Sequence, residues 1–389
     1  MKDRWEVIDS IRSVARDEWD AVVRGCGGSV FQSHRWLMSY EEAPPAPLFH
    51  TRHLLLRKGG QLRAVAPMYH VAEDPHYTGY GPDYGFDHPI LRTPMLVGHS
   101  WYSYFNGVLS LEPADQIADS LVATMHDVAG EIDAPFYGFP GVPEQDPLGP
   151  ELALRGFTPI YTEATSGVDF AGSAQAHLDT LRTAKLRREF RRLAGKAEKL
   201  GAEVRQGVEE GSIEAFAKLV EDVCARHGIP SINPPHSLRS IFRNLDGNVH
   251  FLSVWRDERL LGGFVLLQFD DVLYAWIAGL DYEHNKEFGT YHALYAQTLA
   301  LAERLAVRRI EMGRSMYGFK TRMGFHPQLL VSWFRARNDQ GAELLLTGVP
   351  ELEAACRTRW RIAEAYRSNG LDVPESLLGD ARFAPVPVA

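Results

Sequence analysis

The feature that most limits the possible folds is a run of three apolar segments joined by short acidic turns. The segments are Val249–Arg256, Leu261–Phe269 and Val272–Leu280, and the turns contain Asp257-Glu258 and Asp270-Asp271. Connections this short join antiparallel strands, because a parallel connection needs a crossover of about a dozen residues or more. The spacing therefore predicts a meander of three antiparallel strands in the second half of the chain.

Two helical segments precede this meander, and a helix and two strands follow it. In chain order these are His177–Leu200, Ile213–His227, Tyr291–Ala306, Arg309–Gly313 and Leu329–Arg337. Strands and helices mixed in this order indicate an α/β (α+β) unit, in which helices flank a mixed, largely antiparallel twisted sheet.

Two similar words close the two halves of the chain. They are Gly156-Phe157-Thr158-Pro159 and Gly324-Phe325-His326-Pro327, and a strand-like stretch follows each. The first half also contains two hairpin strands and a helix, at Arg52–Arg57, Arg63–Tyr69 and Ile117–Ala129. This repetition favours a tandem duplication of one structural unit.

The duplication predicts an N-terminal unit at 1–172, a C-terminal unit at 173–340 and a helical tail at 341–389. The length of 389 residues agrees with two domains of about 150 residues each and a tail. Within the first unit, residues 1–40 are predicted to be helical: apolar residues recur at three-residue steps from Trp5 to Val14, and Trp19, Val22 and Val23 extend the pattern.

The composition excludes several classes of protein. A net charge of −9 is unlike a protein that coats duplex DNA, so any anion-binding site must be local. The three cysteines are far apart in the sequence, which matches neither a disulfide framework nor a metal site, and no metal is expected. The first residues lack the apolar core of a signal peptide, and no run is long enough for a membrane span. We therefore expect a cytoplasmic protein.

Three short motifs carry a resemblance to known proteins. They are Phe31-Gln32-Ser33-x-x-Trp36-Leu37, Lys185-Leu186-Arg187-Arg188 and Gly318-Phe319-Lys320. Together with the order of elements, they make the second half similar to a GNAT acyltransferase and the first half similar to a degenerate copy. The two copies resemble the Fem-like peptidyltransferases and related tandem GNAT acyltransferases.

This resemblance implies an enzyme that transfers an acyl or aminoacyl group from an activated ester or thioester to an amine, forming an amide. In Fem-like members the donor is aminoacyl-tRNA, and in ordinary GNAT members it is acyl-CoA. Other tandem members work in biosynthesis and take the acyl group from a carrier protein. No permanently bound cofactor is implied.

Lys320 is the leading catalytic candidate. Ordinary GNAT units often have a tyrosine five residues before the closing Phe, and in this chain that position before Phe325 is Lys320. A cationic amine there could stabilise the oxyanion or protonate the leaving group, and Tyr317 in the same loop is a second candidate. The first half has Leu152 at the matching position, which predicts a single active centre. The alternative is a surface lysine in solvent.

Two segments are candidates for binding the donor. Acyl-CoA enzymes have a [Arg/Gln]-x-x-Gly-x-[Gly/Ala] motif where this chain has Lys286 to Tyr291; Gly289 is kept, but Tyr291 replaces the small residue. This departure argues against tight binding of the CoA pyrophosphate. The basic segment contributes Lys185, Arg187 and Arg188, which could attract an anionic donor. The alternatives are an ordinary helix start and a solvated charged helix.

Two further sets of residues complete the candidate site. Asp281 and His284 follow the third strand of the meander, where a general base for the amine could lie. Aromatic side chains of the first half could line an acceptor cleft, although core packing explains them equally well. The aromatic candidates are Tyr80, Tyr84, Trp101 and Tyr104.

The sequence therefore predicts a tandem GNAT-fold acyltransferase that joins an acyl group to an amine of a small molecule or peptide. The donor we favour is a thioester, on an acyl carrier protein or CoA. An aminoacyl-tRNA donor is an alternative, and so is a non-catalytic module that binds cell-wall precursors or a partner protein.

Overall fold

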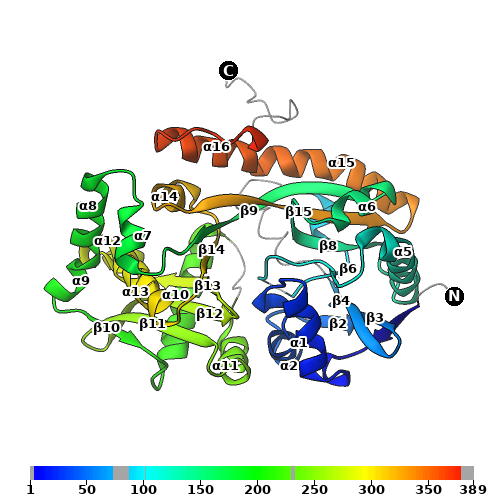
Figure 1. Ribbon diagram of the computed structural model, residues 1–389, viewed down its shortest axis with the longest axis horizontal. Helices are drawn as coiled ribbons and strands as arrows, with labels where there is room; N and C mark the ends of the chain where they lie inside the picture. The colour runs from blue at the N-terminus through cyan, green and yellow to red at the C-terminus, as the bar shows by residue number, and fades with distance from the viewer. Residues whose placement is uncertain (1–3, 73–86, 101, 229–232, 378–389) are drawn as a thin grey trace. The chain divides into compact units, whose positions relative to one another are not determined.

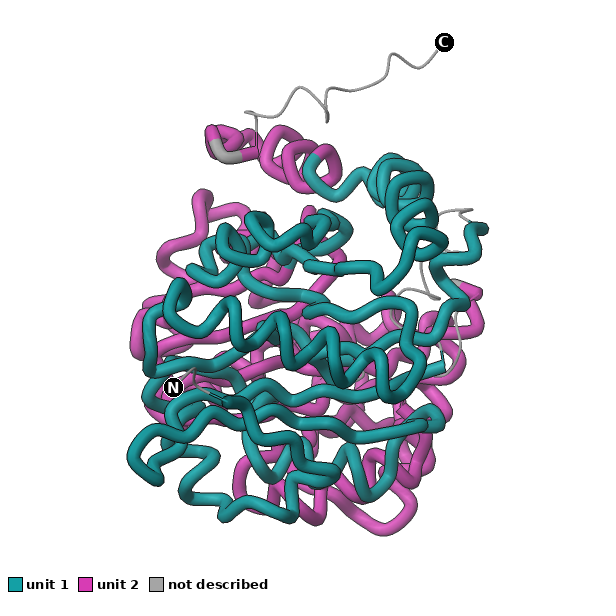
Figure 2. The backbone as a smooth tube through the Cα atoms, turned by 90° about the vertical axis from the view of Figure 1, so that its right-hand side faces the viewer, with its two compact units in different colours: residues 1–164, 328–359, 381–389 teal, residues 165–327, 360–380 magenta. Residues whose placement is uncertain are grey.

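A computed structural model describes residues 4–72, 87–100, 102–228 and 233–377 of the chain (Figure 1). The chain divides into two compact units (Figure 2). Unit 1 comprises residues 1–164, 328–359 and 381–389, and unit 2 comprises residues 165–327 and 360–380. Neither unit is a continuous stretch of sequence.

The sheet of unit 2 contains the predicted meander. Its strands run in the order β10-β11-β12-β13-β14-β9, and every pair is antiparallel except β13 and β14, which are parallel. The strands are β10 (Glu203–Gln206), β11 (Val249–Arg256), β12 (Arg259–Phe269), β13 (Val272–Leu280), β14 (Arg309–Arg314) and β9 (Thr158–Asp169), of which residues 165–169 belong to this unit.

Helices cover both faces of this sheet. Gly262 and Gly263 are neighbours on β12 and face opposite sides, since a Cβ on Gly262 would meet Thr290 and one on Gly263 would meet Phe216. The helices are α7 (Ala174–Asp179), α8 (Ala184–Ala194), α9 (Lys196–Lys199), α10 (Ser212–His227), α11 (Pro235–Asn244), α12 (Tyr282–Phe288), α13 (Thr290–Arg304), α14 (Tyr317–Arg322) and α16 (Thr358–Ser368), with a 3-10 turn η4 (Glu375–Leu377). Buried apolar side chains of α13 form the centre of the core, among them Leu294 and Leu299.

Unit 1 contains two groups of strands. One has the order β1-β3-β4-β7, with β1 (Trp5–Ile8), β3 (His53–Lys58), β4 (Gln61–Ala66) and β7 (Leu109–Ser110). The other has the order β15-β8-β6-β5-β2, with β15 (His326–Ala336), β8 (Phe136–Pro143), β6 (Met95–Val97), β5 (Tyr69–Val71) and β2 (Leu48–Thr51). β3 and β4 form the hairpin that the sequence predicts.

One helix of unit 1 begins at the Phe31-Gln32-Ser33 motif. Ser33 of the Phe31-Gln32-Ser33 motif caps α2, and its side chain accepts a hydrogen bond from the backbone N–H of Trp36. The helices are η1 (Ile11–Ser13), α1 (Arg16–Gly25), η2 (Val30–Gln32), α2 (His34–Glu42), η3 (Pro89–Arg92), α5 (Ala114–Glu131), α6 (Leu148–Leu154) and α15 (Asp339–Cys356).

Two strands pass from one unit to the other along the chain. Residues 165–169 of β9 pair with β14 and so extend the sheet of unit 2. Residues 330–336 of β15 pair with β8 and so extend the sheet of unit 1. Each unit therefore takes a strand from the segment that follows the other half. For this reason the boundaries between the compact units lie at 164/165 and 327/328, whereas the predicted boundaries lie at 172/173 and 340/341. The predicted tail is divided, with α15 in unit 1 and most of α16 in unit 2.

The predicted helical segment over residues 1–40 is confirmed only in part. The helices α1 and α2 form there, but Trp5–Ile8 forms β1, which pairs with β3, and Ile11–Ser13 forms only a 3-10 turn. The spacing of Trp5, Ile8 and Ile11 satisfies a helical pattern by coincidence, because it joins one buried strand residue to a separate turn. No helix in the described part of the chain is long and apolar enough to cross a membrane.

Candidate active site

The two parallel strands of unit 2 pair over only a short length. The pairs are Val272–Arg309, Leu273–Ile310 and Tyr274–Glu311, although β13 continues to Leu280 and β14 to Arg314. On its other edge β13 is bulged, because Val265 lies opposite Ile277 whereas Leu266 lies opposite Ala275. Bulges are frequent beside active sites, where they redirect a strand. The carboxyl ends of β13 and β14 therefore diverge after their first three pairs.

Lys320 lies on α14, the short helix that follows β14. Its side chain is buried, with 3% of the residue exposed, so its ammonium does not face bulk solvent. Nζ donates hydrogen bonds to the carbonyls of Gly313 (2.9 Å) and Arg314 (2.5 Å) at the end of β14. An ammonium has three N–H groups, and these two bonds fix the direction of the third.

Burial lowers the pKa of Lys320 to about 7, and the negative charge of Glu311 opposes this shift. Desolvation disfavours the charged form of a lysine, whereas a nearby carboxylate favours it. Such a lysine can gain or lose a proton at neutral pH. Strongly shifted groups of this kind concentrate at functional sites.

The turn between β14 and α14 is strained. Ser315 and Met316 have φ values of 59° and 50°, in the left-handed region that costs a residue with a side chain roughly 1–2 kcal/mol. Gly313, at φ 65°, precedes them without this cost. The two hydrogen bonds from Lys320 hold the beginning of this turn. Strain that is maintained by its surroundings is common in functional sites. Tyr317 is the first residue of α14 and is half-buried.

Asp281 and His284 lie at the carboxyl end of β13. His284 Nδ1 donates to Asp281 Oδ2 (3.1 Å), which leaves Nε2 as the basic nitrogen. Asp281 also caps α12, because its Oδ1 accepts from the backbone N–H of Glu283 (3.1 Å). Arg259 donates to Asp281 Oδ2 (2.7 Å), the oxygen that also accepts from His284. Because β13 and β14 are parallel, Lys320 and this Asp-His pair follow the same edge of the sheet.

Asp281, Glu283 and His284 are also the one set of described residues whose ligand atoms lie close enough together to hold a metal ion, within 4.8 Å. The guanidinium of Arg259 occupies Asp281 Oδ2, where a cation would bind. The closeness of these three side chains is therefore explained by the helix cap and the ion pair that Asp281 forms.

Only glycine fits at position 289, because α8 packs closely against its backbone. Gly289 has φ 65°, and a Cβ there would lie 2.5 Å from the carbonyl oxygen of Leu193. The N–H of Tyr291 in the first turn of α13 donates to Asn285 Oδ1 (3.1 Å), and the Tyr291 ring packs against Phe319 at 5.0 Å. This helix start therefore has less room and fewer open donors for a pyrophosphate than the usual motif provides. Lys286 is exposed, and its carbonyl accepts from Lys196 Nζ (2.9 Å).

The basic residues of α8 separate into two groups. Arg187 is half-buried and donates to the carbonyl of Leu181 (2.6 Å), so it anchors the start of the helix. The basic face of α8, as we name it, consists of exposed cations with no hydrogen-bonding or ion-pair partner in the part of the chain that the structure describes. Its members are Lys185, Arg188, Arg192 and Lys199, the last on α9.

The predicted acceptor residues are placed only in part. Tyr80, Tyr84 and Trp101 lie outside the described residues. Tyr104 is 2% exposed in unit 1 and packs on Phe31, with a ring-centroid distance of 4.5 Å. Its position is that of a packing residue.

The sequence analysis did not single out Glu311, which is 1% exposed on β14 and contributes to the electrostatics of Lys320. A signal was present, because Arg309 and Glu311 alternate with Ile310 and Met312 in an otherwise buried strand. Charges at alternate positions of a short strand share one face.

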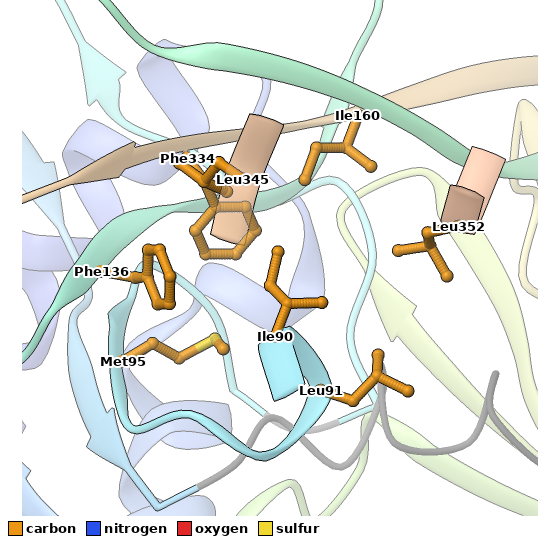
Figure 3. Close-up of a pocket in the computed structure, with 8 residues that line it drawn as sticks. All are labelled: Ile90, Leu91, Met95, Phe136, Ile160, Phe334, Leu345 and Leu352. Carbon is orange, nitrogen blue, oxygen red and sulfur yellow. The ribbon is translucent and has the colours of Figure 1, made fainter. Parts of the chain in front are cut away.

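A small cavity lies within unit 1 (Figure 3). Its volume is about 20 Å³, and it is lined only by apolar side chains. They are Ile90, Leu91, Met95, Phe136, Ile160, Phe334, Leu345 and Leu352. With no polar group on its walls, this cavity has no means to catalyse acyl transfer.

Comparison with known proteins agrees with this geometry. Residues 184–321 match the family described as an acetyltransferase (GNAT) domain, a range that begins at α8 and includes Lys320. No curated protein is similar enough in sequence to be matched with the chain. The match is to a part of unit 2 that resembles a GNAT acetyltransferase domain, and the prediction of an acyltransferase is confirmed.

Solved structures show the same fold over most of the chain. FemX is 14% identical with a TM-score of 0.60, covering 88% of this chain and 99% of FemX. A tandem GNAT protein from the clavulanic acid biosynthesis pathway is 14% identical with a TM-score of 0.54, covering 86% and 99%. L-PGS from Bacillus licheniformis is 10% identical with a TM-score of 0.53, covering 86% and 96%. The predicted tandem GNAT fold is confirmed.

Proposed function

We propose that unit 2 transfers an acyl group from a thioester to an amine of a small molecule or peptide and so forms an amide. The observation that carries this proposal is the buried ammonium of Lys320, held at the end of β14 where β13 and β14 have diverged. A donor group that lies along the diverging strands would bring its carbonyl toward that ammonium.

The chemistry assigns a role to each side chain. The amine nitrogen attacks the thioester carbon, a C–N bond forms, and the carbonyl oxygen becomes an oxyanion. The third N–H of Lys320 would stabilise that oxyanion, or deliver a proton to the thiolate when the C–S bond breaks. His284 Nε2 would take the proton that the attacking amine loses, with Asp281 orienting the ring.

The donor is an anionic thioester, either acyl-CoA or a phosphopantetheine arm on a carrier protein. The basic face of α8 supports an anionic donor, because no described residue forms an ion pair or hydrogen bond with these cations. The same cations would suit the 3′ end of an aminoacyl-tRNA, which is the second candidate donor.

The test supplies the purified protein with each donor class and an extracted pool of cellular amines, and detects amide products by intact mass. We expect product with acyl-CoA or a loaded carrier protein, and no loss of product after RNase treatment. Loss after RNase treatment would establish the tRNA donor instead. No product with any donor would leave only a binding module.

The residue test is Lys320→Met, which keeps the side-chain length and removes the charge. We expect the rate to fall about 10²- to 10³-fold, the usual cost of one oxyanion donor. Lys218→Met is the matched control, because it removes an exposed ammonium of the same unit that lies on α10, outside the basic face of α8. Full activity of a folded Lys320→Met protein would contradict the proposed mechanism.

A further inference from the structure

Unit 2 contains a row of alternating charges that ends at Lys320. Asp169 is exposed on β9 and accepts from Arg309 NH1 (3.0 Å), and Arg309 Nε donates to Glu311 Oε1 (2.6 Å). The exposed fractions of the Asp169, Arg309 and Glu311 side chains are 91%, 35% and 2%. The row thus runs from solvent to the buried carboxylate whose charge acts on Lys320.

The backbone of β9 is shaped to admit the Arg309–Glu311 pair. Gly167 lies opposite Glu311 in the strand register, and a Cβ there would be 2.3 Å from Glu311 Oε1 and 2.4 Å from Arg309 NH2. Glycine weakens a strand interior, so a glycine here has a steric reason: the ion pair lies directly over its backbone. Thr165, on the same face, donates its hydroxyl to Glu311 Oε2 (3.4 Å).

We propose that Glu311, kept ionised by Arg309, is a positioning residue that holds Lys320 in its protonated form and thereby sets the upper pH limit of acyl transfer. This rests on the role of Lys320 in the proposed function. Burial raises the pKa of Glu311, and the ion pair with Arg309 and the hydrogen bond from Thr165 oppose that rise and favour the anion. A buried ammonium likewise needs a counter-charge, which Glu311 supplies.

Burial has the largest influence on the protonation of Lys320, and Glu311 is the charged group that opposes it. Among the described residues, Lys320 interacts with Glu311 and donates to the carbonyls of Gly313 and Arg314, which end the same strand that carries Glu311. The charged groups that act on Glu311 are Arg309 and Lys320. Carbonyl dipoles remain when Glu311 is neutralised, but the full negative charge is lost. Lys320 would then lose its proton at a lower pH.

The first test is Glu311→Gln, read by NMR titration of isotope-labelled lysine side chains, with the Lys320 signal assigned from Lys320→Met. We expect the Lys320 midpoint to move down by at least about one pH unit, the usual effect of an opposite charge. The alkaline limb of the pH–rate profile should move with it. An unchanged Lys320 midpoint in Glu311→Gln would overturn the proposal.

Two further variants make this test decisive. Glu311→Met, which is apolar and of similar length, should lower the midpoint in the same way, because it removes the same negative charge while Arg309 keeps its partner Asp169; this variant decides the question if Glu311→Gln does not fold. Asp169→Asn is the control and should shift the midpoint little, since Asp169 is screened by solvent. An equal shift in Asp169→Asn would also refute the role of Glu311. The NMR midpoint tests this row of charges even if Lys320→Met remains active, so failure of the proposed function is separately visible.

Discussion

Lys320 serves the stability of unit 2 as well as its proposed chemistry. Its ammonium bonds the two carbonyls that begin the strained turn, at Gly313 and Arg314. The same side chain must be desolvated to reach them, which is why its pKa falls to about 7. A buried lysine of this kind makes folding depend on pH.

The pH dependence has a definite sign. The pKa of Lys320 is about 7 in the folded protein and has an ordinary value of 10.5, so the unfolded chain binds more protons between these values. Wild-type stability should therefore rise relative to that of Lys320→Met as the pH increases from 7 to 10, by on the order of a few kcal/mol. Urea unfolding of both proteins at several pH values measures this difference. A difference that stays constant over that range would show that the lysine is not desolvated as described.

At this scale the sequence predicted some residues and missed others for physical reasons. Lys320 was a candidate because a short motif and its distance from Phe325 marked it. The alternation of Arg309 and Glu311 on one strand was a local signal for Glu311, but the role of Gly167 on another strand leaves no local pattern. The departure from the motif at Tyr291 is visible in the sequence, but only the structure shows that its ring packs on Phe319.

Among the elements, the basic face of α8 has the clearest functional consequence. The C-terminal end of α8 packs against the junction of α12 and α13, where the carbonyl of Leu193 lies next to Gly289. Cations on α8 are thus next to the helix start that follows β13. An anionic donor that approaches this end of the sheet would meet them first.

We therefore expect Arg188→Glu combined with Arg192→Glu to raise KM for the donor by roughly tenfold or more at low salt, with kcat little changed. The effect should shrink as salt increases, because exposed charges are screened beyond about 10 Å at 0.1 M ionic strength. Steady-state kinetics at two salt concentrations provide the measurement, with Arg16→Glu on α1 of unit 1 as the control for a charge reversal. A donor KM equal to that of the control variant would remove the face from the binding path.

The elements themselves were predictable where local rules decide them. The meander β11–β13 follows from turns too short for any crossover, and the β3–β4 hairpin follows from its glycine turn. The strand β1 was missed, because a four-residue strand is defined by its partner β3 rather than by its own spacing. The early end of the β13–β14 pairing leaves no mark in either strand alone.

At the scale of the molecule, the exchange of β9 and β15 decides what can be separated. The predicted unit 173–340 lacks residues 165–169, which pair with β14 and include Gly167. A fragment cut there would expose the edge of β14 and leave Glu311 without Thr165. Such an edge favours aggregation.

We expect a fragment of residues 165–327 to be more soluble, and to melt at a higher temperature, than a fragment of residues 173–340. Expression of both with the same tag, followed by thermal melts monitored by circular dichroism, makes the comparison. The intact chain serves as the reference for a folded unit. If the fragment 173–340, which lacks the paired residues of β9, were equally stable, the pairing of β9 with β14 would not be needed for folding.

The late position of β15 also has a consequence for how the protein is made. The sheet of unit 1 is extended by residues 330–336, which leave the ribosome only after most of the chain. Residues 1–164 of unit 1 therefore leave the ribosome before β15 exists, so the edge of β8 stays unpaired while residues 165–327 are translated. Synthesis from the N-terminus thus completes the second half's sheet before the first half's.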